Sequence, residues 1–432
     1  MYKEISKLIM YGNLDNNSIL SSMADIFNRF DNNLSSKEEL ITDIYTQIKR
    51  ILEVATDYGF DNNLWHNYLT YFLITNENPF SITCEKVGAN DGSVNIFARN
   101  DFKVFYNLFH YDFSEIEEKL GIDCFSIISN YKAIVKKELM YNKNVSEKVR
   151  ELSSRLERTK NENEFFDEVT EFYKAFGVGM FGLNKAFRIS SDEKDGLVFH
   201  PINNMDKVVL DDLIGYEIQK QKLVENTENF VQGRKANNAL LFGDSGTGKS
   251  TSIKAIVNQY YDQGLRMIEV YKHQFKDLND VIAQIKNRNY KFIIYMDDLS
   301  FEEFEIEYKY LKAVIEGGLE KKPDNVLIYA TSNRRHLIRE TFKDKEDRDE
   351  ELHTNDTVQE KLSLVARFGV TIYFGKPDKK QFQEIVRELA KKNGIDMPDD
   401  ELLLEANKWE LSHGGLSGRT AQQFIDYLAG TR

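Results

Sequence analysis

The chain of 432 residues has only two cysteines, Cys84 and Cys124, and it has no long apolar run. Two cysteines are too few for a disulfide framework or a thiolate metal site, so we expect both to be small buried side chains in a reducing compartment. No run approaches the ~18 apolar residues that a membrane-spanning helix needs. These absences predict a cytoplasmic protein that does not enter a membrane.

Basic residues are in the minority: 57 Lys and Arg stand against 70 Asp and Glu, which gives a formal net charge of -13. This balance disfavours non-specific binding to nucleic acid or to an anionic membrane, since both need a basic surface. A chain of this length exceeds the size at which one hydrophobic core keeps growing. We therefore expect two or three domains.

Residues 1–185 are predicted to form a mainly helical domain. Apolar residues such as Ile41, Ile44 and Ile48 recur at helical spacing, and turn clusters of Asp and Asn separate the periodic stretches. Aromatic residues, among them Trp65 and Tyr68, follow the same spacing, and we expect them in the helix-packing core. This half contains no chemical motif, so its role is not predicted.

A polar segment at 190–196 is interpreted as a linker, and after it the pattern changes. Short apolar runs alternate with amphipathic helices over 186–376, which predicts a parallel sheet with crossover helices. The expected strands are 239–242, 267–270, 292–296, 326–330 and 370–374. Residues 377–432 are predicted to form a helical lid domain, with helices over 381–392, 400–411 and 417–428.

The segment 243–250 reads Gly-Asp-Ser-Gly-Thr-Gly-Lys-Ser and directly follows an apolar run, so it matches the phosphate-binding pattern GxxxxGKS. Its glycines allow the backbone to approach a phosphate closely, and successive N–H groups face the anion at the positive end of the next helix. Lys249 is expected to reach the β- and γ-phosphates, and Ser250 to ligate Mg²⁺. The residues predicted to bind the nucleotide are Gly243, Asp244, Ser245, Gly246, Thr247, Gly248, Lys249, Ser250 and Thr251.

Polar side chains follow two further predicted strands. Asp297 and Asp298 end the apolar run 291–296, where Asp297 is expected to hold Mg²⁺ and Asp298 to orient or deprotonate the attacking water. Asn333 follows the strand over 326–330, and it is placed to bind the γ-phosphate or the water. The alternative interpretations are an acidic turn for the two aspartates and a turn cap for Asn333.

This ordered set of motifs resembles the AAA+ ATPases, together with Arg-Phe-Gly at 367–369 and Ser-Gly-Arg at 417–419. Over about residues 180–432 the sequence is more similar still to a bacterial AAA+ family, domain of unknown function 815 (DUF815). That closer resemblance is carried by Asn-Thr-Glu at 226–228, Asp-Asp-Leu-Ser-Phe at 297–301, Thr-Ser-Asn-Arg-Arg-His-Leu at 331–337 and Leu-Ser at 362–363. It implies an α/β P-loop NTPase core with a five-stranded parallel sheet and a C-terminal helical lid.

The resemblance also implies roles for individual residues. Asn333 matches the sensor 1 position and Arg419 the sensor 2 position, while Arg367 matches an arginine finger that serves the nucleotide of a neighbouring subunit. A finger in trans implies a homo-oligomeric ring or spiral. Ile214 and Gly215 lie where the superfamily contacts adenine, through an apolar side chain and through the backbone. The alternative for Arg367 and Arg419 is an ordinary surface arginine.

One position departs from most AAA+ motors, which carry Asp-Glu where this chain has Asp297 and Asp298. The shorter side chain of Asp298 requires the water to lie nearer the strand or to be held through a second water. Slow hydrolysis is therefore an alternative to fast turnover.

The function predicted from the sequence is an Mg²⁺-dependent ATPase that moves or remodels a macromolecular partner. One alternative is a slow or non-hydrolysing ATP-dependent switch or scaffold. A second is a DNA-associated loader, although the sequence shows no basic stripe, helix-turn-helix signature or aromatic stacking platform. A protein partner is therefore favoured over nucleic acid.

Overall fold

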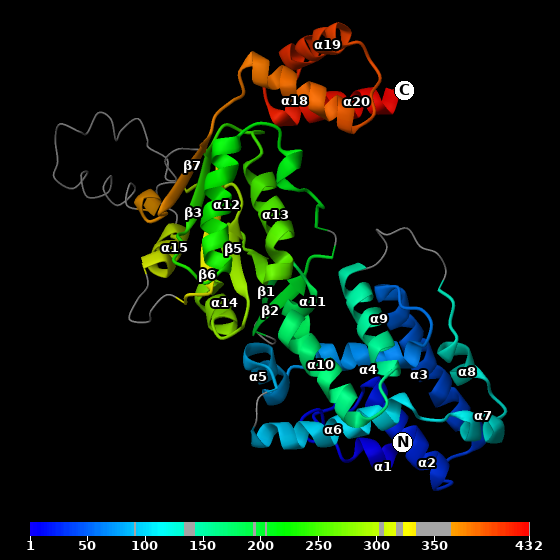
Figure 1. Ribbon diagram of the computed structural model, residues 1–432. Coiled ribbons are helices and arrows are strands. Elements are labelled where there is room, and N and C mark those ends of the chain that lie inside the picture. Colours follow the sequence, from blue (N-terminus) through cyan, green and yellow to red (C-terminus); the bar gives the residue numbers. More distant parts are fainter. Residues whose placement is uncertain are drawn as a thin grey trace. The chain divides into compact units, whose positions relative to one another are not determined.

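The computed structural model of the protein describes residues 1–89, 92–133, 143–192, 196–203, 205–301, 306–316, 323–333 and 364–431. The chain divides into two compact units, Met1–Asn184 and Lys185–Arg432 (Figure 1). Each unit has a hydrophobic core of its own and is described by itself. The motif residues 334–337 and 362–363 lie outside the described residues.

The first unit is built from helices, which confirms the prediction from apolar spacing (Figure 1). The helices are α1 (Tyr2–Ile5), α2 (Ile19–Asp31), α3 (Lys37–Tyr58), α4 (Leu64–Thr75), α5 (Pro79–Val87), α6 (Ser93–Phe109), α7 (Ser114–Leu120), α8 (Cys124–Ser129), α9 (Lys143–Glu157), α10 (Glu162–Phe176) and α11 (Gly179–Leu183). In the described parts of both units, every helix is too short or too polar to cross a membrane.

Aromatic side chains fill the core of this unit, as predicted. Trp65 and Tyr68 on α4 are buried, and the indole N–H of Trp65 donates to the carbonyl of Leu108 at 2.9 Å. Tyr11 and Tyr173 are fully buried and share a hydrogen bond of 2.7 Å between their hydroxyls. Large rings remove much apolar area from water, and each polar end here has a partner. The aromatic residues of α4 are thus explained by packing.

Both cysteines lie in the same core as free thiols. Burial raises the pKa of Cys84 and of Cys124 to about 11 in each case. Because the thiolate is the reactive form, both side chains stay protonated and inert at neutral pH. Their role is packing, as their small number predicted.

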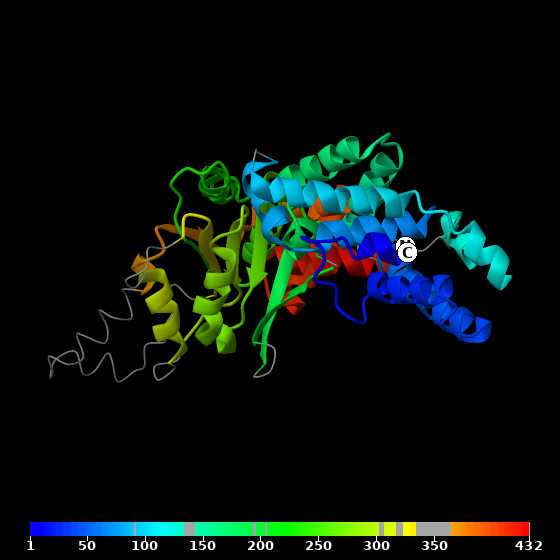
Figure 2. The ribbon, with the colours of Figure 1, turned by 90° about the horizontal axis from the view of Figure 1, so that it is seen from below.

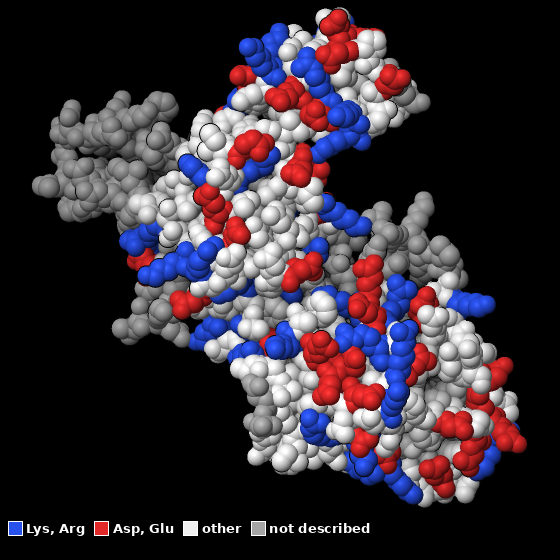
Figure 3. All heavy atoms as spheres, in the orientation of Figure 1, with Lys and Arg blue, Asp and Glu red and all other residues white. Residues whose placement is uncertain are grey.

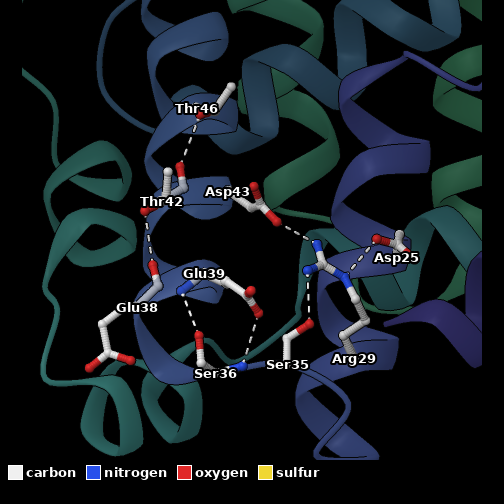
Figure 4. A network of polar contacts seen from close by, with 9 residues as sticks. All are labelled: Asp25, Arg29, Ser35, Ser36, Glu38, Glu39, Thr42, Asp43 and Thr46. Carbon is white, nitrogen blue, oxygen red and sulfur yellow. Dashed lines mark hydrogen bonds and ion pairs between the residues drawn. The ribbon is translucent and has the colours of Figure 1, made fainter.

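Polar contacts fix the corner between α2 and α3 (Figure 4). Ser36 and Glu39 form a capping box at the start of α3, with bonds of 3.2 Å and 3.1 Å between the side chain of each and the backbone N–H of the other. Arg29 on α2 donates to Asp25 at 2.8 Å and to Asp43 on α3 at 2.6 Å. An N-cap contributes about 1 kcal/mol to helix stability. These contacts hold the two helices together, so we interpret their role as structural.

The second unit is built on a sheet that has seven strands within the described residues, in the order β2-β1-β4-β5-β6-β3-β7. The strands are β1 (Ala186–Asp192), β2 (Gly196–Pro201), β3 (Ala239–Gly243), β4 (Leu265–Glu269), β5 (Lys291–Met296), β6 (Val326–Ser332) and β7 (Val370–Phe374). Neighbouring strands are parallel, except that β1 and β2 are antiparallel. The carboxyl ends of β3, β5 and β6 therefore lie together at one edge of the sheet.

Strands β3 to β7 are the five predicted strands, but the linker predicted at 190–196 is wrong. Residues 190–192 belong to β1 and Gly196 begins β2, and the two strands form a hairpin. The hairpin lies at the end of the sheet, where Phe187, Ile189 and Phe199 are buried, while the last residues of β1, over 190–192, are polar. These polar residues lie next to the turn of the hairpin, and turns have the same polar composition as linkers.

Helices cover both faces of the sheet. Helices α12 (Glu217–Val231) and α13 (Lys249–Tyr260) pack on one face, and α14 (Leu278–Ile285) and α15 (Glu307–Glu316) lie on the other (Figure 2). The strands between them are almost continuously apolar because both faces are covered. A 3₁₀ turn over Tyr261–Gln263 follows α13 and ends at Gly264, whose φ is 90°.

The Asn-Thr pair of the 226–228 motif has a structural role. The side chains of Asn226 and Thr227 on α12 bond to the buried hydroxyl of Tyr329 on β6, at 3.0 Å and 2.8 Å. Asn226 also donates to the carbonyl of Asn237, just ahead of β3, at 2.8 Å. These bonds fix α12 against the two strands whose ends carry the polar motifs.

The C-terminal part of the second unit is a small helical bundle with its own apolar cluster, as predicted. Its helices are α18 (Lys379–Lys392), α19 (Asp399–Ser412) and α20 (Gly418–Thr431). Buried residues from the three helices meet at its centre, among them Phe382, Leu402 and Phe424. This bundle follows directly from β7 and supplies the lid of the site described next.

Candidate functional site

The phosphate-loop motif forms a tight turn between β3 and α13. Gly243, Gly246 and Gly248 have φ values of 134°, 74° and 92°, which residues with a Cβ rarely adopt. A Cβ on Gly243 would lie 2.1 Å from the carbonyl oxygen of Phe374, and one on Gly248 would lie 2.6 Å from the Leu213 side chain. The glycines are therefore required by the backbone path itself. The loop ends at the N-terminus of α13, where free N–H groups favour an anion.

Lys249 is the first residue of α13, and its side chain is 6% exposed. Its ammonium donates to the carbonyl oxygens of Gly243 at 3.0 Å and Asp244 at 2.6 Å, and to Asn333 Oδ1 at 3.0 Å. Burial lowers the pKa of Lys249 despite nearby carboxylates that oppose the shift. A buried cation bonded only to neutral oxygens is well placed to accept an anionic partner.

The side-chain oxygens of Ser250 on α13 and of Asp297, directly after β5, lie next to each other. The Ser250 hydroxyl donates to Asp297 Oδ1 at 2.7 Å, and the Thr331 hydroxyl donates to the same oxygen at 2.5 Å. Burial alone raises the pKa of Asp297, but hydrogen bonds from Thr331 and Ser250 outweigh it and leave the pKa lowered. An ionised carboxylate beside a hydroxyl is a donor set that fits Mg²⁺, which prefers oxygen ligands.

Asp298 is held in an uncommon conformation directly after Asp297. Its φ is 49°, a left-handed value that is rare outside glycine. The Asp298 N–H donates to Thr331 Oγ1 at 2.9 Å, and its Oδ1 accepts from the side-chain amide of Asn333 at 2.8 Å. Since Asn333 also accepts from Lys249, one amide links the lysine of the loop to the second aspartate. The structure thus brings together three residues that the sequence separates by up to 84 positions.

A cavity of about 730 Å³ contains these groups. The predicted residues that line it are Ile214, Ser245, Gly246, Thr247, Gly248, Lys249, Ser250, Thr251, Asp297, Asp298, Asn333 and Arg419. Gly243, Asp244, Gly215 and Arg367 lie outside the set of described residues that line the cavity. A volume of this order accommodates a nucleotide-sized ligand.

The lining of the cavity also has an apolar part, of which only Ile214 was assigned a contact from the sequence. Besides Ile214 it includes Leu213 and Tyr216 from the segment before α12, and Ile385 and Leu389 from α18 of the lid. This is the type of surface that a planar base contacts. From helical spacing, the apolar residues of the lid are expected only in the core of its bundle. The sequence does not show that some of them also line a cavity with another segment.

The lid touches the phosphate loop directly. The backbone N–H of Arg419 donates to the carbonyl of Gly246 at 3.2 Å, and a Cβ on Gly246 would lie 3.1 Å from Arg419 Cβ. Ser417 caps this end of α20 by accepting from the Thr420 N–H at 3.0 Å. The guanidinium of Arg419 is thereby carried at the first turn of α20, beside the loop.

Arg367 lies in the turn that precedes β7. Its guanidinium pairs with Glu316 at the end of α15 at 2.6 Å, and both side chains are partly exposed. This contact agrees with the surface alternative for Arg367, and it also leaves the side chain at the surface where a second subunit could meet it.

Asp244 forms hydrogen bonds to the segment that connects β7 to the lid. Its carboxylate accepts from the backbone N–H of Lys376 at 2.9 Å, and its own N–H donates to the carbonyl of Phe374 at 2.9 Å. Tyr216 donates its hydroxyl to the carbonyl of Gly375 at 2.8 Å. The chain between β7 and the lid is therefore tied to the phosphate loop.

One comparison with known proteins identifies the family of the chain. The sequence model of a family described as "Protein of unknown function (DUF815)" matches residues 183–432. The chain belongs to the DUF815 family. The matched region contains the whole α/β unit with its lid, so the family resemblance noted in the sequence is confirmed, and residues 1–182 lie outside the match. No curated protein matches the chain.

Among solved structures, two RuvB mutants of Thermotoga maritima are similar to the chain at 16% and 17% identity, with TM-scores of 0.35 and 0.36. The alignments cover 51% and 52% of this chain, and they span less than two thirds of the RuvB chains, 64% and 65%. The AAA domain of FIGL-1 in complex with ADP is 17% identical over 53% of this chain and 74% of its own, with a TM-score of 0.37. The fold of the second unit follows from its own topology: a mainly parallel sheet covered by helices, with a phosphate loop between β3 and α13, is the α/β fold of P-loop NTPases.

Proposed function

We propose that the protein binds ATP and Mg²⁺ in this cavity and hydrolyses the ATP to move or remodel a macromolecular partner. The observation that carries the proposal is the convergence of the phosphate loop, the Asp297 and Asp298 carboxylates and Asn333 on one cavity. Each group has the chemistry that one part of phosphoryl transfer needs. The fold alone would support nucleotide binding in many reactions, so the argument rests on these side chains.

The residues divide the work by their chemistry. Lys249 would bind the β- and γ-phosphates, while Ser250 and Asp297 would hold the metal ion. When bound, Mg²⁺ would supply positive charge to the phosphate oxygens. Asp298, oriented by Asn333, would accept a proton from the attacking water or align it. Arg419 would add positive charge from the lid.

A homo-oligomer with Arg367 in trans is part of the proposal. Phosphoryl transfer needs positive charge on the equatorial oxygens, and a neighbour can supply it. Arg367 is partly exposed and lies outside the described lining of its own cavity, which supports a role in a neighbouring site. Its pairing with Glu316 would have to be exchanged for contact with the neighbour's phosphates.

The test is ATP turnover per subunit, measured over a range of protein concentrations. We expect turnover to rise with concentration and Arg367→Ala to lower it roughly 10- to 100-fold, the loss expected for one charge-assisted hydrogen bond. Arg387→Ala is the matched control, because Arg387 forms a similar surface pair with Asp399 on the lid, at 2.9 Å. The control is expected to behave as the parent.

Mixing two impaired variants tests the in-trans assignment itself. Arg367→Ala subunits keep an intact loop and Lys249→Met subunits keep the finger, so a mixed assembly contains sites with both. We expect the mixture to recover part of the parental turnover. Parental activity of Arg367→Ala alone, or no recovery on mixing, contradicts the assignment.

A slow ATP-dependent switch or scaffold is the second candidate function. It is favoured by the short, left-handed Asp298, whose Oδ1 already accepts a hydrogen bond from Asn333. Purified protein that retains bound nucleotide and consumes added ATP only over hours would support this function over rapid turnover.

The class of partner is proposed from charge. On the face drawn in Figure 3, Lys and Arg side chains are interspersed with Asp and Glu over the described residues, without a continuous basic stripe. Binding to nucleic acid draws most of its affinity from contacts between basic side chains and phosphates. A protein partner is therefore favoured over nucleic acid, and a DNA-loader role is the weaker alternative.

A further inference from the structure

Thr331 forms hydrogen bonds to three residues directly after the end of β5, and the sequence predicted no role for it. It lies on β6, is 1% exposed, and faces the point where β5 ends. Its hydroxyl bonds to the side chain of Asp297 and to the N–H of Asp298, and its carbonyl accepts from the Leu299 N–H at 2.7 Å. Three consecutive residues are thus bonded to one threonine.

The direction of each hydrogen bond follows from the groups themselves. The N–H of Asp298 can only donate, so Thr331 Oγ1 accepts there, and the hydroxyl hydrogen is left for Asp297. A threonine hydroxyl has one donor and two acceptor sites. Its single hydrogen is therefore committed to Asp297 Oδ1, the oxygen that also accepts from Ser250.

We propose that Thr331 is a positioning residue that orients both carboxylates of the site. Its hydroxyl would fix the side chain of Asp297 toward the metal ion, and its Oγ1 would hold Asp298 at the left-handed φ of 49°. The inference deepens the proposed function and rests on it. Loss of the hydroxyl would weaken metal binding and turnover, while leaving nucleotide binding without metal intact.

Thr331→Val removes the hydroxyl with little change in shape, and Thr331→Ser keeps the hydroxyl without the methyl group. The readout is calorimetric titration of ATP at increasing Mg²⁺, and in EDTA. For Thr331→Val we expect the half-saturating Mg²⁺ concentration to rise about tenfold or more, the effect of one lost hydrogen bond to an ionised group. ATP affinity in EDTA should stay parental, and Thr331→Ser should restore the parental Mg²⁺ dependence.

A double-mutant cycle identifies the carboxylate through which Thr331 acts on the metal. In an Asp297→Asn background, Thr331→Val should add little further loss of Mg²⁺ affinity, since residues that act through one contact are not additive. Additive losses overturn the inference. Thr331→Ala serves in the same cycle if the valine variant does not fold.

The outcomes separate this inference from the proposed function. If the parent binds no ATP with or without Mg²⁺, both are wrong. If the parent binds ATP with Mg²⁺ and Thr331→Val shows the parental Mg²⁺ dependence, only the role of Thr331 is wrong. If Thr331→Val loses ATP binding in EDTA as well, or Thr331→Ser behaves as Thr331→Val, the residue is structural and the inference is overturned.

Discussion

Replacing Lys249 by methionine is expected to weaken ATP binding by about 10- to 100-fold, the range for a lost charge-assisted hydrogen bond, and to abolish hydrolysis. The ammonium is almost buried and bonds only to uncharged oxygens, so it lies ready for a phosphate. Methionine has a similar length and no charge. The measurement is the ATP dissociation constant by calorimetry, together with the rate of phosphate release.

Lys254→Met is the matched control for this change. Lys254 lies on the same helix, but its ammonium pairs with Asp206 at 2.8 Å at a partly exposed position. We expect Lys254→Met to bind and hydrolyse ATP as the parent does. The thermal unfolding temperatures of Lys254→Met and Lys249→Met are expected to be the same. Unchanged ATP binding by a folded Lys249→Met protein contradicts the assignment of the phosphate loop.

Asp298→Asn is expected to lower the rate of ATP hydrolysis at least about 100-fold, which is the lower range for loss of a general base. Asparagine adopts left-handed φ values more readily than most residues, so the backbone at 49° is preserved. Its Oδ1 can still accept from Asn333, so the substitution removes the charge and keeps that contact. ATP affinity should therefore stay close to that of the parent.

The comparison variant for Asp298→Asn is Asp280→Asn, an exposed acidic residue in the first turn of α14. It makes the same chemical change away from the cavity and should leave turnover unaltered. Single-turnover measurements at saturating ATP isolate the chemical step from binding. Turnover by Asp298→Asn at the parental rate would show that this carboxylate has no part in the chemistry.

The parallel core of the fold could be predicted because buried strands and amphipathic helices have distinct periods. Strands β3 to β7 and the lid helices α18 to α20 are found where apolar runs and amphipathic stretches predicted them. The β1–β2 hairpin was missed because its polar residues at 190–196 read as a linker. Composition does not separate the two cases, since hairpin turns and linkers are both rich in polar residues.

The site was predictable to the extent that its residues follow strands. Parallel strands end at one edge of the sheet, so the side chains that follow them lie close together. The positions of Asp297, Asp298 and Asn333 after predicted strands were therefore enough to expect them in one site. The contribution of Ile385 and Leu389 to the cavity was not predictable, since it depends on the docking of the lid against a separate segment. The hydrogen bonds from Thr331 to three successive residues depend on the register between β5 and β6. The sequence does not give this register, so these bonds could not be predicted.

The central claim is that ATP with Mg²⁺ occupies the cavity between the phosphate loop and the two aspartates. The most direct test is isothermal titration of nucleotide-stripped, folded protein with ATP, with and without Mg²⁺. We predict saturable binding of one ATP per chain, tighter with Mg²⁺, and the loss of that metal effect in Asp297→Asn. No heat of binding from folded protein in either condition would contradict the account.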